Sequence, residues 1–128
     1  MAHARASIGT TNYQTAIVTG HHRLTADEGP GLGGRDVGPG PYELLTAALA
    51  ACTAITLRMY AERKQWPVTN VQADIHFTRS ADKLESIDRV LHIEGADAEQ
   101  KARMAEIAEK TPVTLTLKRS LEIRTTLA

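Results

Sequence analysis

The fold of this chain is decided by the stretch Gly38-Pro-Gly-Pro-Tyr-Glu-Leu-Leu-Thr-Ala-Ala-Leu-Ala-Ala-Cys52-Thr-Ala-Ile-Thr-Leu-Arg-Met-Tyr-Ala-Glu-Arg-Lys64. Pro41 suits the first position of a helix, because a backbone N–H there has no partner within the helix. Glu43 lies in the first turn, where a carboxylate interacts favourably with the helix dipole. The residues that follow are rich in Ala and Leu, which have high helix propensity. The stretch therefore predicts a long helix that ends before Trp66-Pro67.

This helix is predicted to be central and buried. No charged residue occurs between Leu44 and Leu57, and a helix that is apolar all round is usually a buried one. The uncharged run alone is too short to cross a bilayer. One small sheet cannot cover every side of such a helix, so we expect a second copy of the chain to supply the remaining cover in an intertwined dimer.

Cys52 lies in the middle of the predicted helix and has two interpretations. Free cysteine is among the most buried residue types, so it can be a small core residue. A reactive thiol instead needs an electropositive, partly open surrounding. Arg35 and Glu43 precede Cys52, and a charged cluster begins after it at Arg58. The apolar neighbours on its face of the helix are Leu45, Ala48, Leu49, Ile55 and Met59.

The composition predicts one ordinary globular domain over residues 1–128. Fifteen basic and fifteen acidic residues give no net charge, so nothing favours nucleic acid or an acidic membrane as a partner. A single cysteine excludes an intramolecular disulfide and a cysteine-rich zinc site. It fits a reducing, cytoplasmic compartment, and the N-terminus shows no apolar core of a signal peptide.

The remaining segments predict an α+β fold of order ββ-α-ββ-α-β. A first hairpin is expected over residues 12–19 and 23–27, followed by a Gly/Pro loop at 29–40 that lacks the Lys-Ser/Thr of a phosphate-binding loop. Alternating apolar residues predict strands at 71–78 and 87–94. Asp97 and Gln100 form a capping box for a second helix that Pro112 stops. Alternation at 113–123 predicts a last strand.

Neither a metal nor a cofactor is expected. His76 and His92 fall on the polar sides of two strands, where solvated histidines are ordinary, and a metal site needs several converging ligands.

Two motifs resemble the OsmC/Ohr family, the osmotically induced and organic-hydroperoxide-resistance proteins. The stretch from Gly38 to Thr53 is similar to the family's helix motif, (S/N)-P-x-E-L-L-x-A-A-x-x-A-C, and the run from Arg58 to Pro67 resembles an OsmC-like subgroup. Ala108-Glu-Lys-Thr111-Pro-Val-Thr114 is similar to the second motif, which usually reads A-x-K-C-P-V-H. The resemblance covers nearly the whole chain, in matching order.

The resemblance implies an intertwined homodimer that reduces hydroperoxides with two cysteines. Cys52 takes the position of the peroxide-attacking cysteine. Arg35 and Glu43 are the candidates for the arginine and glutamate that hold its thiolate, although the family glutamate falls at Tyr42 in strict register. Thr111 occupies the position of the second, resolving cysteine, and it cannot form a disulfide.

Two functions therefore remain open. The first is a one-cysteine hydroperoxide reductase in oxidative-stress defence, in which an external thiol rescues the sulfenic acid of Cys52. The alternative is a non-catalytic dimer that binds a small hydrophobic ligand in its interfacial cleft. We expect Thr111 to face Cys52, and Cys52 to lie near the dimer interface with limited solvent access and an arginine side chain near its sulfur. A Cys52 sealed in aliphatic packing with no cation near it would favour the non-catalytic dimer.

Overall fold

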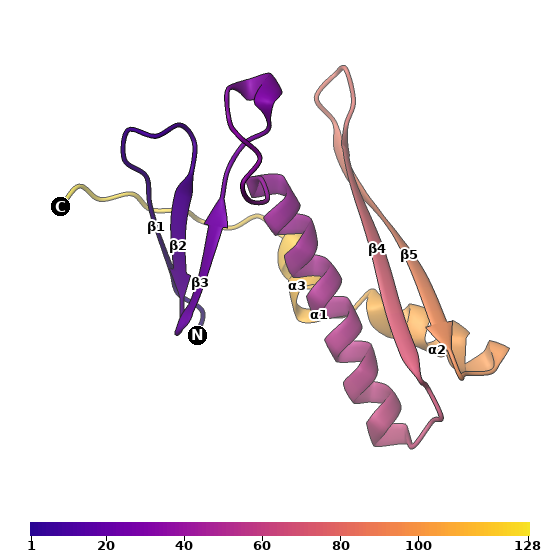
Figure 1. Ribbon diagram of the computed structural model, residues 1–128. Coiled ribbons are helices and arrows are strands. Elements are labelled where there is room, and N and C mark those ends of the chain that lie inside the picture. Colours follow the sequence, from indigo (N-terminus) through magenta and orange to yellow (C-terminus); the bar gives the residue numbers. More distant parts are fainter. The chain divides into compact units, whose positions relative to one another are not determined.

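The computed structural model describes residues 1–128 and confirms the α+β class, with helices and two antiparallel sheets. The chain divides into two compact units, Met1–Leu45 and Thr46–Ala128. In order, the elements are β1 (Ala4–Ser7), β2 (Thr15–Thr19), β3 (His22–Ala26), the 3-10 helix η1 (Pro30–Leu32), α1 (Pro41–Lys64), β4 (Asn70–Arg79), β5 (Glu85–Glu94), α2 (Ala98–Ala108) and α3 (Pro112–Leu117) (Figure 1).

The first unit contains a three-stranded antiparallel sheet of order β1-β2-β3. The predicted hairpin is confirmed as β2 and β3, with Gly20 at a φ of 60° in the turn between them. Strand β1 was not predicted, because Ala4–Ser7 has none of the β-branched or aromatic residues that indicate a strand. The strand is instead stabilised by antiparallel pairing with β2, in which Arg5 lies opposite Val18.

Helix α1 begins at Pro41 and ends at Lys64, as predicted, and Gln65 then turns the chain with a φ of 58°. Its buried residues form one stripe at a spacing of four: Leu49, Thr53, Leu57 and Ala61. Another face carries Ala48, Ala51, Ile55 and Met59, which are exposed; we call these four residues the α1 stripe. A single chain thus covers only part of a helix whose full length, unlike its uncharged run, is long and apolar enough to cross a membrane.

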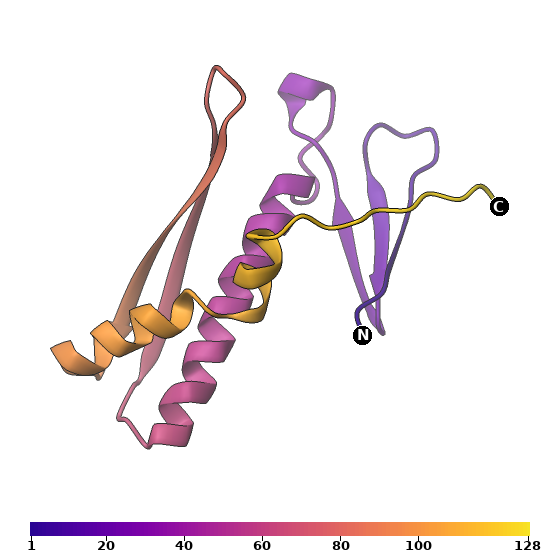
Figure 2. The ribbon, with the colours of Figure 1, turned by 180° about the vertical axis from the view of Figure 1, so that it is seen from behind.

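The core of the second unit lies where α1, β5 and α2 meet. Leu57 and Ala61 of α1 pack with Val68, Ile93, Met104 and Ala108 in one buried cluster. Strands β4 and β5 form a regular hairpin, with Val71 opposite Ile93 and Ile75 opposite Arg89. Figures 1 and 2 show α2 crossing the end of this hairpin that is nearest the C-terminal end of α1.

The predicted last strand at 113–123 is wrong. The capping box of Asp97 and Gln100 is confirmed, with hydrogen bonds of 2.8 and 3.0 Å, but α2 ends at Ala108 instead of continuing to Thr111. Thr111 becomes the N-cap residue of α3, and Pro112 begins that helix. Proline stops one helix and starts the next, because its fixed φ suits a first helical position. Residues 118–128 have no regular structure.

Candidate functional site

Cys52 lies at the boundary between the buried and the exposed face of α1. The residue is half-buried. Its neighbours Leu49 and Thr53 are buried, whereas Ala48 and Ile55 are exposed. Its sulfur lies 3.9 Å from the hydroxyl oxygen of Thr56, one turn later. The thiol is therefore at the edge of the apolar α1 stripe rather than sealed in the core.

The guanidinium of Arg89 forms hydrogen bonds with residues of three helices, α1, α2 and α3. Its side chain is only 11% exposed, because it lies on the inward face of β5. Nη1 donates to the hydroxyls of Thr53 at 3.1 Å and Thr114 at 2.8 Å. Nη2 donates to the carbonyl oxygen of Ala108 at 2.8 Å and to the carboxylate of Glu109 at 2.7 Å. Arg89 thus joins β5 to α1, to the end of α2 and to α3.

Thr111 lies inside this arrangement. The residue is fully buried, and its hydroxyl oxygen lies 2.6 Å from that of Thr114. We call Arg89, Thr53, Thr111 and Thr114 the threonine cluster. The cluster joins Thr53, the residue after Cys52, to Thr111 and Thr114. These two are the positions at which the second motif differs from the family pattern. The sequence carries a signal for Arg89, namely an arginine at an inward position of an alternating strand.

A second polar centre lies in the first unit, at Asp27. This carboxylate is 2% exposed. Oδ1 accepts the backbone N–H groups of Tyr13 at 3.1 Å and Glu28 at 2.8 Å, and Oδ2 accepts those of Arg35 and Val37, both at 3.2 Å. Burial raises the pKa of Asp27, but the four N–H donors together outweigh burial, so the pKa lies below its ordinary value.

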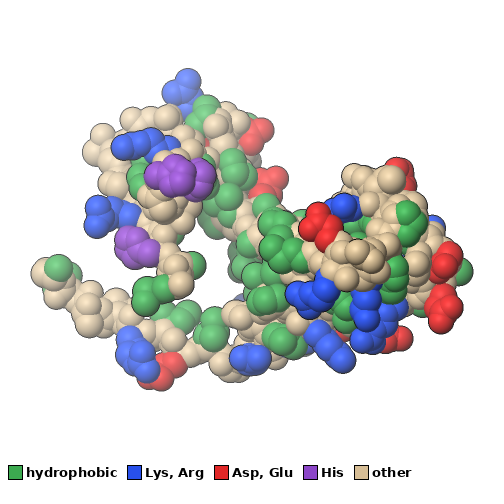
Figure 3. All heavy atoms as spheres, turned by 90° about the horizontal axis from the view of Figure 1, so that it is seen from below, with side chains coloured by type: hydrophobic (Ala, Val, Ile, Leu, Met, Phe, Trp, Pro, Cys, Tyr) green, Lys and Arg blue, Asp and Glu red, His purple; other side chains and the backbone are tan.

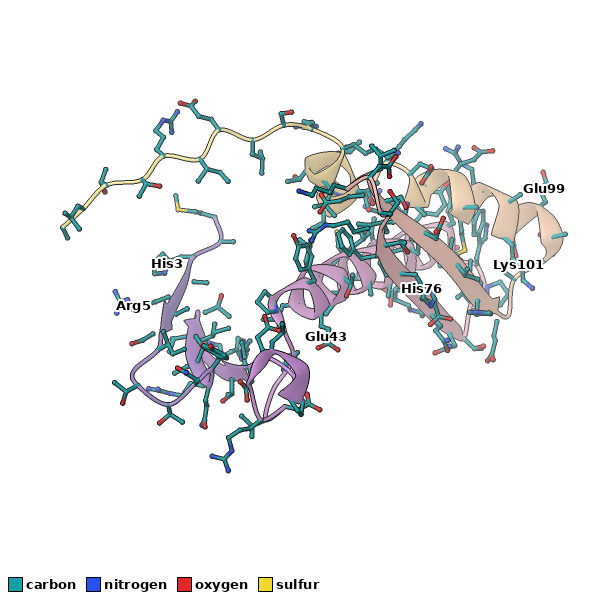
Figure 4. The ribbon with its side chains drawn as sticks, turned by 90° about the horizontal axis from the view of Figure 1, so that it is seen from above. His3, Arg5, Glu43, His76, Glu99 and Lys101 are labelled. Atoms are coloured by element: carbon teal, nitrogen blue, oxygen red, sulfur yellow. The ribbon has the colours of Figure 1, made fainter.

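The candidate residues Arg35 and Glu43 have defined places in the first unit. The backbone N–H of Arg35 donates to Asp27, and its side chain is exposed. Oε1 of Glu43 accepts the N–H of Gly40 at 2.9 Å, so this carboxylate caps the start of α1 (Figure 4). Cys52 and Thr111 belong to the second unit. An arginine beside the Cys52 sulfur and a direct approach of Thr111 stay predictions.

The histidines on the β4–β5 hairpin are exposed. Nε2 of His92 lies 3.1 Å from Oδ2 of Asp74 on the neighbouring strand, and Figure 4 shows His76 on the same hairpin. No three His, Cys, Asp or Glu side chains converge as they would around a metal ion. Acidic and basic side chains both occur on the face seen in Figure 3, in keeping with the zero net charge.

The sequence profile of the family described as OsmC-like protein matches residues 33–126. The chain belongs to the OsmC-like family. Both motifs of this OsmC-like chain, with Cys52 in the first and Thr111 in the second, lie within the matched range, which confirms the predicted family. No curated protein sequence matches the chain.

Solved structures share the OsmC-like fold at low sequence identity. An OsmC-like protein from Mycoplasma pneumoniae is 19% identical, with a TM-score of 0.73 over 92% of this chain and 87% of that chain. The organic hydroperoxide resistance protein OsmC of Legionella pneumophila is 21% identical, with a TM-score of 0.66 over 92% and 89%. An organic hydroperoxide resistance protein of Elizabethkingia anophelis is 21% identical, with a TM-score of 0.69 over 92% and 88%.

Proposed function

We propose that this OsmC-like protein is a one-cysteine hydroperoxide reductase with Cys52 as its nucleophile. The observation that carries the proposal is the place of Cys52, half-buried at the edge of the exposed apolar α1 stripe. A thiol there is open to a small molecule, and its apolar surroundings suit the alkyl group of an organic hydroperoxide. Two structures with the same fold are named organic hydroperoxide resistance proteins, which supports the same substrate class.

The chemistry needs one thiol in the chain and two from outside it. The Cys52 thiolate attacks the outer oxygen of the hydroperoxide, the O–O bond breaks, and the alkoxide takes a proton and leaves as an alcohol. Cys52 is then a sulfenic acid. A small external thiol displaces water from the sulfur and forms a mixed disulfide, and a second thiol reduces that disulfide and restores Cys52. No cofactor takes part.

Thr111 makes the external thiol necessary. A hydroxyl cannot attack a sulfenic acid to form a disulfide, and Cys52 is the only cysteine in the chain. The proposal therefore assigns the whole reductive half of the cycle to a small-molecule or protein thiol. Such thiols are maintained in a reducing compartment, so the proposed location is the cytoplasm.

Arg35 and Glu43 are the proposed supports of the Cys52 thiolate, and the proposed assembly is a homodimer. A cation near the sulfur lowers the pKa of a cysteine and raises its thiolate fraction. The second copy would pack against the α1 stripe, which one chain leaves exposed, with Cys52 at the edge of that interface, so that a cleft between the copies admits the hydroperoxide. An obligate interface of this kind buries roughly 2,000 Å² or more.

The second candidate function is a non-catalytic dimer that binds a small hydrophobic ligand. The observation that favours it is the threonine cluster, in which Thr111 is fully buried and hydrogen-bonded where the family places a redox-active cysteine. An apolar cleft beside the α1 stripe, between the two copies, is equally suited to a ligand that undergoes no reaction.

Turnover measurements separate the two functions. Cumene hydroperoxide is supplied with dithiothreitol as the external thiol, and peroxide loss is followed for the wild-type protein and for Cys52→Ser. The enzyme requires wild-type turnover that Cys52→Ser abolishes and that Arg35→Met or Glu43→Gln slows. Equal peroxide loss with wild type, with Cys52→Ser and without protein supports the second function.

A further inference from the structure

Asp27 is the only charged side chain among the buried residues. A buried carboxylate is stable only when its oxygens are hydrogen-bonded, and all the donors here are backbone N–H groups of the first unit. Two of them, from Arg35 and Val37, are eight and ten residues further along the chain. The carboxylate therefore links Glu28, at the start of the Gly/Pro loop, to Arg35 and Val37 in its second half.

Further backbone contacts near Asp27 hold the two ends of the loop together. The N–H of Asp27 donates to the carbonyl oxygen of Pro39 at 3.1 Å, and the N–H of Asp36 donates to that of Glu28 at 3.1 Å. A Cβ atom at Gly34 would overlap the carbonyl oxygen of Glu28, and one at Gly38 would overlap that of Thr25. The backbone at Gly34 and Gly38 thus lies directly against that of Glu28 and Thr25, an approach that only glycine allows.

We infer that the Asp27 carboxylate is a clamp that holds residues 28–40 in one conformation and so fixes where the backbone of Arg35 lies and where the chain enters α1. The inference does not depend on the proposed peroxide chemistry.

The clamp depends on both oxygens of the carboxylate, so substitutions at position 27 should release specific backbone N–H groups. Oδ1 accepts those of Tyr13 and Glu28, and Oδ2 accepts those of Arg35 and Val37. An asparagine has the same shape, but one end of its amide is a donor and cannot accept an N–H. Asp27→Asn should therefore release one pair of backbone N–H groups and keep the other, whereas Asp27→Ala should release all four.

Amide hydrogen exchange, measured by NMR on the full chain, tests the clamp. In Asp27→Asn we expect one of the two pairs to exchange about tenfold faster or more, and in Asp27→Ala all four amides. The matched control is Asp36→Asn in the same loop, which should leave all four unchanged, because asparagine tolerates the φ of 53° at that position. Four amides that stay equally protected in Asp27→Ala would overturn the inference.

Trypsin provides a second measurement that needs no variant. A clamped loop should resist cleavage after the exposed Arg35, whereas Arg124 lies in a segment without regular structure. We expect cleavage after Arg35 to be about tenfold slower or more than cleavage after Arg124 in the wild-type protein. Equal rates would contradict the clamp even if the variants at position 27 do not fold.

Discussion

The guanidinium of Arg89 donates a hydrogen bond of 2.8 Å to the hydroxyl of Thr114, the residue that stands where the second family motif has a histidine. The same nitrogen donates to Thr53 at 3.1 Å, next to Cys52 in the chain. The two motifs are thus joined by a non-covalent contact in this chain, through an arginine that belongs to neither of them.

Replacing Arg89 should destabilise the second unit. Arg89→Met leaves the buried hydroxyls of Thr53 and Thr114 without their donor, and we expect a loss of about 2–4 kcal/mol in the free energy of unfolding. Arg89→Lys should lose less, because it keeps the charge but not the forked donor geometry. Urea denaturation measures both.

The control for this prediction is Arg124→Met. Arg124 pairs with Glu122 at 2.8 Å, but its side chain is 77% exposed. Surface ion pairs contribute little, so the change should stay within about 0.5 kcal/mol. Equal losses for Arg89→Met and Arg124→Met would show that the threonine cluster does not stabilise the fold.

Changing the α1 stripe should weaken the proposed dimer. Ile55 is 54% exposed in the single chain, so Ile55→Glu places a charge on a surface that only a second copy would bury. We expect dimerisation to weaken about a hundredfold or more, as measured by sedimentation equilibrium. Val90→Glu is the matched control, because Val90 is 49% exposed on the polar face of the β4–β5 hairpin. A monomeric wild type, or a dimer unaffected by Ile55→Glu, contradicts the assembly.

A second cysteine should restore the family's disulfide. If Thr111 faces Cys52 as predicted, Thr111→Cys should form a disulfide between residues 52 and 111 after a hydroperoxide pulse, since the family cycle brings these positions within about 7 Å. Non-reducing mass spectrometry detects the bond. Thr116→Cys, on the exposed side of α3, should form no such bond. Failure of Thr111→Cys would mean that the two positions do not approach each other.

The Asp27 clamp predicts a specific loss of stability in acid. The pKa of Asp27 is lower in the folded chain than its ordinary value of 3.8. A lowered native pKa stabilises the fold above the unfolded pKa, and the stabilisation disappears as pH falls through the native value. The stability difference between wild type and Asp27→Asn should therefore be constant from pH 7 to about 5 and shrink below about 4. A difference that does not change down to pH 2 would contradict it.

Elements with a strong local signal could be predicted from the sequence. Helix α1 follows from Pro41 and the Ala/Leu run, the β4–β5 hairpin from its alternation, and the start of α2 from Asp97 and Gln100. Residues 113–123 were misassigned because Val113, Leu115 and Leu117 fit a strand pattern as well as one turn and a half of helix. The contact of Thr114 with Arg89 favours the helix, and no local pattern reveals that contact.

The candidate site was predictable only in part. The motif identified Cys52 and the substituted position Thr111, because both lie in recognisable runs of sequence. Arg89 and Asp27 were missed, since all but one of their partners lie between 8 and 36 residues away in the chain. Arg89 does lie at an inward position of β5, and a charged residue at such a position indicates a buried charge that needs hydrogen-bond partners.

The central claim is that Cys52 is the nucleophile, and its most direct test is the mass of the intact protein after a hydroperoxide pulse. The wild-type protein is exposed briefly to cumene hydroperoxide or to hydrogen peroxide without added thiol, and the modification at Cys52 is followed with time. We expect the sulfenic acid and its over-oxidised products at Cys52, formed faster by the organic hydroperoxide, and none in Cys52→Ser. An unmodified Cys52 in wild type after both pulses would contradict the account.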